Sequence, residues 1–384
     1  MGFYVTDETR DSLLNYRYHG EDRSLLYKYV LSPMAVRLVE FIPLWVAPNV
    51  ISVFGLSLLV IASAVTYLHS PGLNCALPDS VYKLCALSIF LYQTLDNLDG
   101  KQARRIGNST PFGLLIDHGV DALAVTITTL IMGAVFQTGP GIPILTLWLM
   151  GMIPFTFATW EEYHTGSLVL GILNGASDGL ALAVLCCLLP VFFGAEFWIT
   201  PILSPEALSS DWAWIGALHR NKIVILLLII GLIPTVIMNM NNVIRSRRAN
   251  SKSVLGPFKT LGPFVILVSA SFVWFFYSPS KVQTTNPRWC LFTIGFVFGN
   301  IACKLMLAHV GNHNYRVKRY SLFPVVVAAI NSLLGAPINE VAITIVTLVT
   351  AVACWLHFVV IAGWEMTEIL GIRVFFVKPL AKAC

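Results

Sequence analysis

Four acidic side chains lie close together in an otherwise apolar part of the chain: Asp96, Asp99, Asp117 and Asp121. The first two are three positions apart and the last two are four apart, so each pair shares one face of a helix. Between the pairs, Thr110 is suited to cap a helix and Pro111 to occupy its first position. Two helices joined by a short turn are antiparallel neighbours, and the acidic faces are expected to meet.

Carboxylates at close range repel one another and lose hydration in a membrane, so they need cations. Oxygen ligands of this kind favour the hard divalent ions Mg²⁺ and Mn²⁺. Two such ions about 4 Å apart form a common arrangement for phosphoryl transfer. Lys101, Arg104 and Arg105 add positive charge where a phosphate would bind. The alternatives are solvated helix ends for the acids and, for Arg105 above all, membrane orientation for the bases.

Small residues accompany the acids on both expected helices. Gly100 and Ala103 continue the face of the first pair, and Gly113 precedes the second pair on its face. Small side chains let a ligand or another backbone approach closely. Close helix packing is the alternative explanation for all three.

The whole chain is strongly apolar. Of its 384 residues 56% are hydrophobic and 12% are charged, whereas a soluble domain has about 25% charged residues. The composition predicts an all-α, polytopic membrane protein, in which Pro190 and Pro234 could break the fifth and sixth spans. A helical span needs about 20 residues, and about ten segments qualify or nearly qualify: 50–69, 81–96, 111–137, 142–161, 167–193, 213–238, 261–277, 289–309, 320–335 and 341–363.

The chain divides into three expected regions. Residues 1–48 form a cytosolic or interfacial segment, in which Leu25–Val46 has the amphipathic pattern of a helix lying along the membrane surface. Residues 49–244 form a six-helix catalytic core. Residues 245–384 form a four-helix membrane region with a cytosolic tail. This region begins with a basic stretch, Arg245–Ser253, that marks the boundary.

The basic residues predict the orientation. With ten spans both termini share one side, and most of the 25 Lys and Arg residues fall there. The positive-inside rule makes that side cytosolic, together with the aspartates. The sequon at Asn108 then faces the cytosol and is expected to carry no glycan. Orientation and anionic lipid headgroups account for the net charge of +5 without a nucleic acid partner, and the eight cysteines show no metal-binding spacing.

The aspartate region resembles the CDP-alcohol phosphotransferase family. The family signature appears complete as Asp96-x2-Asp99-Gly100-x2-Ala103-Arg104-x8-Gly113-x3-Asp117-x3-Asp121. The similarity extends over at least residues 43–180, including "PLWVAPNVIS", "YQTLDNLDGKQARR", "FGLLIDHGVDAL" and "TWEEYHTGSLVLGILNGASDGL". These stretches look like the eukaryotic choline/ethanolamine phosphotransferase branch of the family.

The resemblance implies roles for the signature residues. It implies that two Mg²⁺ or Mn²⁺ ions bind to Asp96, Asp99 and Asp117, with Asp121 completing the site. It also implies a CDP site in which Asp96 takes part through the metals. Small residues clear space for the nucleotide there and two polar residues help to hold it: Gly100, Ala103, Gly113, Asn49 and Arg104.

The general base is left open between two residues. The family favours Asp121, whereas the pKa of a histidine favours His118. A histidine on a helix face can also be purely structural. Glu161 and Glu162 are adjacent acids at the cytosolic end of the fourth expected span, and they are expected to be solvated there.

Headgroup and acceptor contacts are sought in the segment that follows. Asp178 stands where related enzymes usually carry a glutamate, so its reach toward the metals or the headgroup is uncertain from sequence. Aromatic side chains can cage a quaternary ammonium, and three are candidates: Tyr92, Trp160 and Tyr163.

The expected reaction is transfer of phosphoethanolamine or phosphocholine from the CDP-alcohol to diacylglycerol. Ethanolamine is favoured, with cross-use of choline. The alternatives are the same chemistry with another alcohol such as inositol, and a divalent-cation transporter. The resemblance further implies a homodimer in the endoplasmic reticulum or Golgi membrane, with its active site facing the cytosol.

Overall fold

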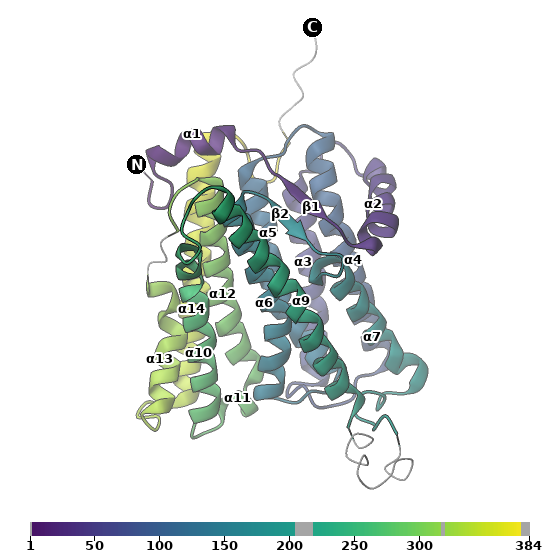
Figure 1. Cartoon of the computed structure of the whole chain (residues 1–384). Coiled ribbons are helices and arrows are strands. Elements are labelled where there is room, and N and C mark those ends of the chain that lie inside the picture. Colours follow the sequence, from purple (N-terminus) through teal and green to yellow (C-terminus); the bar gives the residue numbers. More distant parts are fainter. Residues whose placement is uncertain (1, 204–217, 316–318, 378–384) are drawn as a thin grey trace.

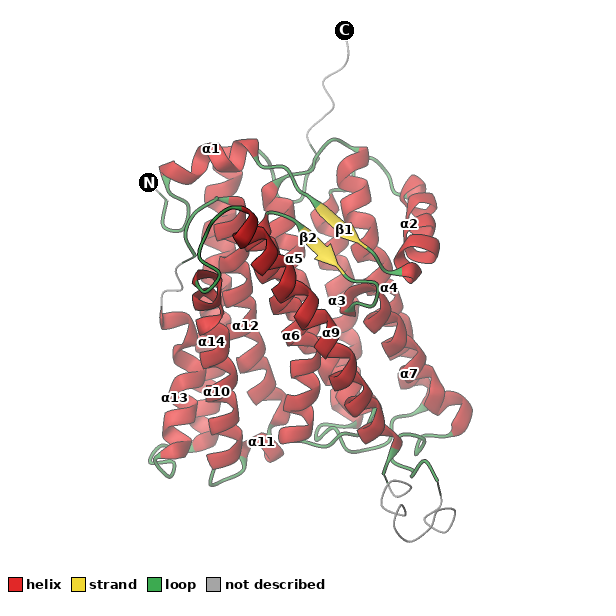
Figure 2. Cartoon of the chain, viewed as in Figure 1, coloured by secondary structure: helices red, strands yellow, loops and turns green. Residues whose placement is uncertain are grey.

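A bundle of long helices makes up most of the molecule (Figures 1 and 2). In the computed structural model, residues 2–203, 218–315 and 319–377 are described. Within them, eight helical segments are long and apolar enough to cross a membrane. Their bounds are Pro48–His69 (α3), Pro111–Val135 (α5), Ile142–Thr165 (α6), Gly175–Phe193 (a π-helical turn followed by α7, Leu180–Phe193), Arg220–Ala249 (α9), Gly256–Tyr277 (a 3-10 turn followed by α10, Gly262–Tyr277), Pro287–Val310 (α12) and Glu340–Leu370 (α14).

Two further helices run alongside these segments in the bundle. They are α4 (Asp79–Arg105), which carries the first acidic pair, and α13 (Phe323–Leu333) (Figure 1). A four-residue helix, α11 (Val282–Thr285), joins α10 to α12. The all-α polytopic fold expected from the sequence is confirmed.

The fifth and sixth expected spans differ from the structure in their bounds. The segment expected at 167–193 starts with a short strand and a π-helical turn, and its helix α7 begins at Leu180. The sixth helix, α9, continues to Ala249 and includes the basic stretch that had suggested a boundary. Pro190 and Pro234 lie inside α7 and α9 without ending them. Residues 213–217 of the sixth expected span lie outside the described residues.

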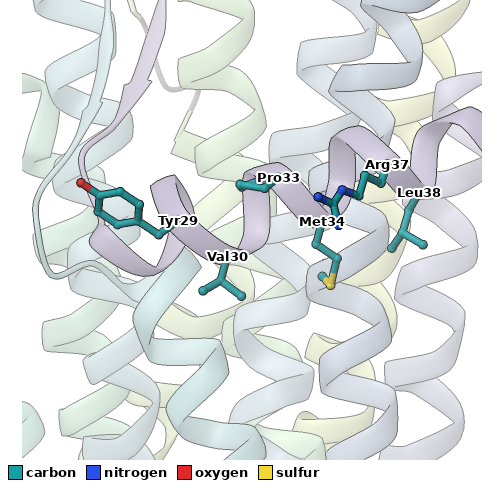
Figure 3. A pocket seen from close by; sticks show the side chains of 6 residues that line it. All are labelled: Tyr29, Val30, Pro33, Met34, Arg37 and Leu38. Atoms are coloured by element: carbon teal, nitrogen blue, oxygen red, sulfur yellow. The ribbon is translucent and has the colours of Figure 1, made fainter.

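The N-terminal region contains the expected surface helix. It consists of a π-helical turn (Tyr27–Leu31), α2 (Ser32–Leu38) and a 3-10 turn (Val39–Phe41). Its buried face packs on α3 and α4 through a cluster with Ile51 and Leu98. On another face, Val30, Met34 and Leu38 follow one another at steps of four and point to the same side, beside a shallow pocket (Figure 3). This pattern suits a helix with one face on protein and one in the interface.

A small parallel sheet joins two distant segments at the end of the bundle where α2 lies. Strand β1 (Gly20–Asp22) pairs with strand β2 (Leu168–Leu170), which follows α6 (Figure 2). A preceding helix, α1 (Asp7–Asn15), runs over the same end of the bundle (Figure 1). The N-terminal segment is therefore part of the structure around the ends of α4 and α5.

The last four long helices share a core with the first six. The apolar stretch of α12 is 89% buried, whereas that of α9 is 6% buried, so α12 is the central helix of the bundle. It packs against α5, α6 and α14. Gly295 of α12 allows a close contact with α5. A Cβ at this position would lie 2.4 Å from Thr126 Oγ1, so a larger side chain would clash.

Candidate active site

Three carboxylates converge where α4 and α5 lie side by side. Ligand oxygens of Asp96, Asp99 and Asp117 all lie within 4.8 Å of one another. The i, i+3 spacing on α4 places its two acids on the face toward α5, as expected. Three convergent carboxylates fit a hard divalent cation such as Mg²⁺ or Mn²⁺.

Side chains on neighbouring helices orient this cluster. Asp99 is buried and accepts a short hydrogen bond from the Ser52 hydroxyl of α3. Asp121, one turn beyond Asp117 on α5, accepts a hydrogen bond of 2.5 Å from the Tyr92 hydroxyl of α4. Tyr92 therefore holds the fourth acid in place, which is a different role from the ammonium cage considered for it.

A buried chain of titratable groups starts beside Asp117. His118 Nε2 lies 3.1 Å from Glu162 Oε2, and its Nδ1 lies 3.1 Å from the Leu114 carbonyl. Behind Glu162, His309 Nε2 of α12 lies 3.6 Å from Oε1 and 3.0 Å from the Tyr16 hydroxyl. The carboxylate thus separates two histidines from different helices, and it can stabilise a proton on His118.

The expectation of solvated glutamates at the end of α6 is wrong. Glu161 is 1% exposed and Glu162 is 0% exposed. Glu161 accepts hydrogen bonds from the side-chain amides of Asn239 and Asn242 on α9. Two consecutive acids within an apolar helix are costly in a membrane unless they are paired, and that cost was the available signal of their burial.

A cavity of about 700 Å³ opens beside the carboxylates. The polar end contains every residue expected to bind metal, nucleotide or proton: Asn49, Asp96, Asp99, Gly100, Ala103, Arg104, Gly113, Asp117, His118 and Asp121. The structure shows why glycine occupies two positions of the family signature. A Cβ on Gly100 would meet the Arg104 guanidinium at 3.6 Å, and one on Gly113 would lie 3.7 Å from Asn49 Oδ1. Side chains there would narrow the space between the two helices.

The same cavity continues into the apolar part of the bundle. Gly113 and Met132 both line it, and they lie about 30 Å apart along α5 at the α-helical rise. Its walls there come from α6, α7 and α9, including Leu147, Cys186 and Val224. The site therefore joins an anionic, polar end to a long apolar channel.

Segments near the N-terminus cover the polar end. Glu21 and Asp22 line the cavity from β1, and Tyr18 lines it from two positions before the strand. Partial burial, with the carboxylates of Glu162 and Asp117 in range, raises the pKa of the Tyr18 hydroxyl. Tyr18 is therefore a protonated hydrogen-bond donor at the cavity wall at neutral pH. Sequence reasoning missed this segment because its pairing partner is far away in the chain.

Three residues considered for the headgroup or acceptor do not line the cavity. Trp160 is fully buried, and its indole nitrogen donates to the Pro257 carbonyl and the Thr260 hydroxyl at 3.0 Å each. Tyr163 donates to the His313 carbonyl. Asp178 accepts from the Ser24 hydroxyl through Oδ1 and from the Asn174 amide through Oδ2, so both oxygens are engaged. These three side chains therefore form hydrogen bonds within the protein, outside the cavity lining.

Asp178 belongs to a polar clasp that fastens β1 to the π-helical turn Gly175–Gly179. In the clasp, Asp22 accepts hydrogen bonds from the Asn174 amide and the Ser177 hydroxyl. The Gln93 amide of α4 in turn donates to the carbonyls of Ala176 and Ser177. The clasp therefore links the N-terminal strand to the helix that carries the first acidic pair.

We expect Asp178→Ala to loosen this strand without removing a cavity-lining side chain. The lost bonds to Ser24 and Asn174 should cost about 1–3 kcal/mol locally, and amide hydrogen exchange across residues 20–24 should accelerate by about tenfold or more. The matched control is Asp11→Ala, because Asp11 is an exposed acid on α1 whose side chain does not line the cavity. Equal exchange in the Asp178 variant and the wild type would show that the clasp does not hold the strand.

Comparison with known proteins identifies the family. A sequence profile of the CDP-alcohol phosphatidyltransferase family matches residues 45–208. The chain is 34% identical to choline/ethanolaminephosphotransferase 1 of Arabidopsis thaliana over 376 residues, which cover 95% of this chain and 96% of that protein. The chain belongs to the CDP-alcohol phosphatidyltransferase family.

Further members of the CDP-alcohol phosphatidyltransferase family from yeast and mouse are also similar. Choline/ethanolaminephosphotransferase 1 of Saccharomyces cerevisiae is 38% identical over 203 residues, which cover 52% of this chain and 51% of that protein. Ethanolaminephosphotransferase 1 of Mus musculus is 27% identical over 368 residues, which cover 92% and 89%. The resemblance noted from the aspartate signature is confirmed. The similarity to the plant and mouse relatives extends beyond the profile match into the helices from α9 to α14.

Proposed function

We propose that the protein transfers phosphoethanolamine or phosphocholine from the CDP-alcohol to diacylglycerol and releases CMP. The single observation that carries this proposal is the continuous cavity that joins the carboxylate cluster to an apolar channel. One end suits the anionic donor with its divalent metal, and the other suits acyl chains. The names of the plant, yeast and mouse relatives support the same reaction.

In this reaction the hydroxyl oxygen of diacylglycerol attacks the β-phosphorus of the donor. The new O–P bond forms as the bond from the β-phosphorus to the CMP oxygen breaks, and CMP leaves as the anion. The residues that would hold the divalent metals are Asp96, Asp99 and Asp117, with Asp121 beside them. Bound metal would stabilise negative charge on the transferring phosphoryl group. Within the protein, Ser52 and Tyr92 keep two of these carboxylates oriented.

In this proposal His118 is the general base that accepts the proton of the lipid hydroxyl. The ring lines the cavity next to Asp117 and has Glu162 behind it. Both ring nitrogens face acceptors, Nδ1 the Leu114 carbonyl and Nε2 the Glu162 carboxylate, so the ring must turn to present a free nitrogen to the lipid hydroxyl. Glu162 then offsets the charge of the protonated ring. Asp121 remains the second candidate because the cavity also reaches it, although the Tyr92 hydroxyl already occupies one of its oxygens.

Lipid would enter the cavity from the membrane. Helix α7 packs mainly on α4 and helix α9 packs on α6, and the apolar channel lies between these pairs. A cytosolic active site follows from the positive-inside rule. The homodimer and the endoplasmic reticulum or Golgi membrane stay predictions from family resemblance.

The direct test is transfer of label from CDP-ethanolamine or CDP-choline to diacylglycerol by the purified protein in detergent. We expect transfer from both donors, with ethanolamine preferred. An assay with CDP-diacylglycerol as donor and inositol as acceptor tests the alternative in which the same chemistry uses another alcohol. Transfer from neither CDP-alcohol to diacylglycerol, with a folded protein, would contradict the proposed function.

Metal removal is expected to abolish this transfer. Excess EDTA should reduce turnover to background, because the carboxylate cluster would lose the charge that holds the diphosphate, and added Mg²⁺ or Mn²⁺ should restore it. Ca²⁺ in equal excess is the control for a non-specific effect of divalent charge, since Mg²⁺ and Ca²⁺ differ in size and coordination. Full turnover in EDTA would exclude a metal at the three aspartates.

A further inference from the structure

A segment from the far C-terminus reaches the polar end of the cavity. Helix α14 ends at Leu370, and Gly371 adopts a left-handed conformation with φ of 58° that turns the chain. Such a position favours glycine because it has no Cβ. Ile372 and Arg373, which follow, line the same cavity as the carboxylates. This contribution comes from outside the region matched by the family profile, residues 45–208.

The segment is anchored on both sides of Arg373. Ile372 and Val374 pack against a buried apolar cluster that contains Phe112 and Leu115, at the start of α5. The Val374 carbonyl also accepts a hydrogen bond of 2.7 Å from the side-chain amide of Asn49. Arg373 therefore has a defined place in the cavity wall.

The anchor itself belongs to the nucleotide end of the site. Asn49 Oδ1 lies 3.7 Å from where a Cβ on Gly113 would be, so Asn49 borders the small-residue face of α5. The resemblance implies that Asn49 helps to hold the nucleotide, and Asn49 lines the cavity. Its amide nitrogen fixes the C-terminal segment, while its oxygen faces Gly113.

The Arg373 guanidinium is available to a ligand. Arg373 is exposed, and over the described part of the chain no hydrogen bond or ion pair engages its side chain. In contrast, Arg105 donates to the carbonyls of Val39 and Ile42, and Arg23 pairs with Glu21. A guanidinium has five donors in a planar fork that matches phosphate oxygens.

The geometry points to Arg373 as a binding residue for the CMP phosphate of the CDP-alcohol donor. The inference rests on the proposed function for its substrate. Arg104 approaches the same end of the cavity from α4, folded over Gly100. The two guanidinium groups, from α4 and from the segment after α14, would flank an anion bound beside the carboxylates. The donor site is then complete only when the C-terminal segment is in place.

The test compares Arg373→Ala, Arg373→Lys and Arg10→Ala in the full-length protein. Arg10 is an exposed base on α1 that does not line the cavity, so its variant controls for lost surface charge. We expect Arg373→Ala to raise the KM for CDP-ethanolamine and weaken CMP binding by about tenfold or more, the effect of losing a charged hydrogen bond. Arg373→Lys should recover part of this loss, and the KM for diacylglycerol should not change.

Three results would overturn the inference. They are a KM and a CMP affinity unchanged in Arg373→Ala, a fall in kcat alone, and an equal loss in Arg10→Ala. CMP binding is measured by calorimetry in the presence of Mg²⁺, with cytidine as the comparison, so that a phosphate contact shows as a selective loss of CMP affinity. If the wild-type protein transfers nothing from CDP-ethanolamine, the proposed function fails, whereas the CMP titration still decides the role of Arg373.

Discussion

Replacing Asp117 with asparagine is expected to lower the turnover of CDP-alcohol transfer by about a thousandfold or more, equivalent to about 4 kcal/mol. The side chain is one of three whose oxygens lie within 4.8 Å of one another. An amide keeps the shape of the carboxylate and removes its charge, so the loss reports on metal binding rather than packing. Asp96→Asn and Asp99→Asn should behave in the same way.

The matched control is Asp79→Asn at the opposite end of α4. Asp79 is an exposed acid in the first turn of that helix and does not line the cavity. Its replacement should change turnover by less than about twofold, because exposed charges at a helix end contribute little. Turnover above a tenth of the wild-type value in the Asp117 variant would remove that residue from the metal site.

His118→Ala is expected to lower kcat by about 10²- to 10⁴-fold, the usual contribution of a general base. The KM for the CDP-alcohol should change little, because a base acts in the transition state whereas a metal ligand also acts in donor binding. Glu162→Gln should give a smaller fall in kcat. That variant keeps the side-chain volume and removes the charge 3.1 Å from the ring.

Asp121→Asn, assayed in the same way, decides between the two candidate bases. If Asp121 accepts the proton, its variant should show the selective fall in kcat and His118→Ala should be mild. Tyr92→Phe separates orientation from proton transfer, since it removes the 2.5 Å hydrogen bond to Asp121 and leaves the carboxylate present. Wild-type turnover in both His118→Ala and Asp121→Asn would exclude both residues as the base.

The carboxylate cluster was predictable because its spacing is local. Asp96 and Asp99 share a helix face by their separation alone, and the capped turn at Thr110 brings the next helix beside it. Apolar length likewise predicted eight of the ten expected spans, since each must satisfy its own backbone in the membrane. The segments expected at 81–96 and 320–335 fall in α4 and α13, which are not among the eight. These features need only nearby residues to be recognised.

The features that were missed depend on contacts between distant segments. The pairing of Gly20 with Leu168, and of Asn49 with Val374, has no signal in the residues around either partner. Trp160 was considered as a cage residue because aromatics suit an ammonium. Its helix instead turns it toward Pro257, and sequence could not give that rotation because apolar residues occupy every face of a buried helix.

Both chain ends take part in the architecture around the active site, and this affects how the protein matures during synthesis. The Glu365 carboxylate of α14 accepts hydrogen bonds from the backbone amides of Tyr4 and Val5, and Val374 binds the Asn49 amide. A ribosome-bound chain that already contains all four aspartates still lacks both partners. Residues 4 and 5 and the side chain of Asn49 can therefore reach these contacts only after α14 and the segment that follows it have been synthesised.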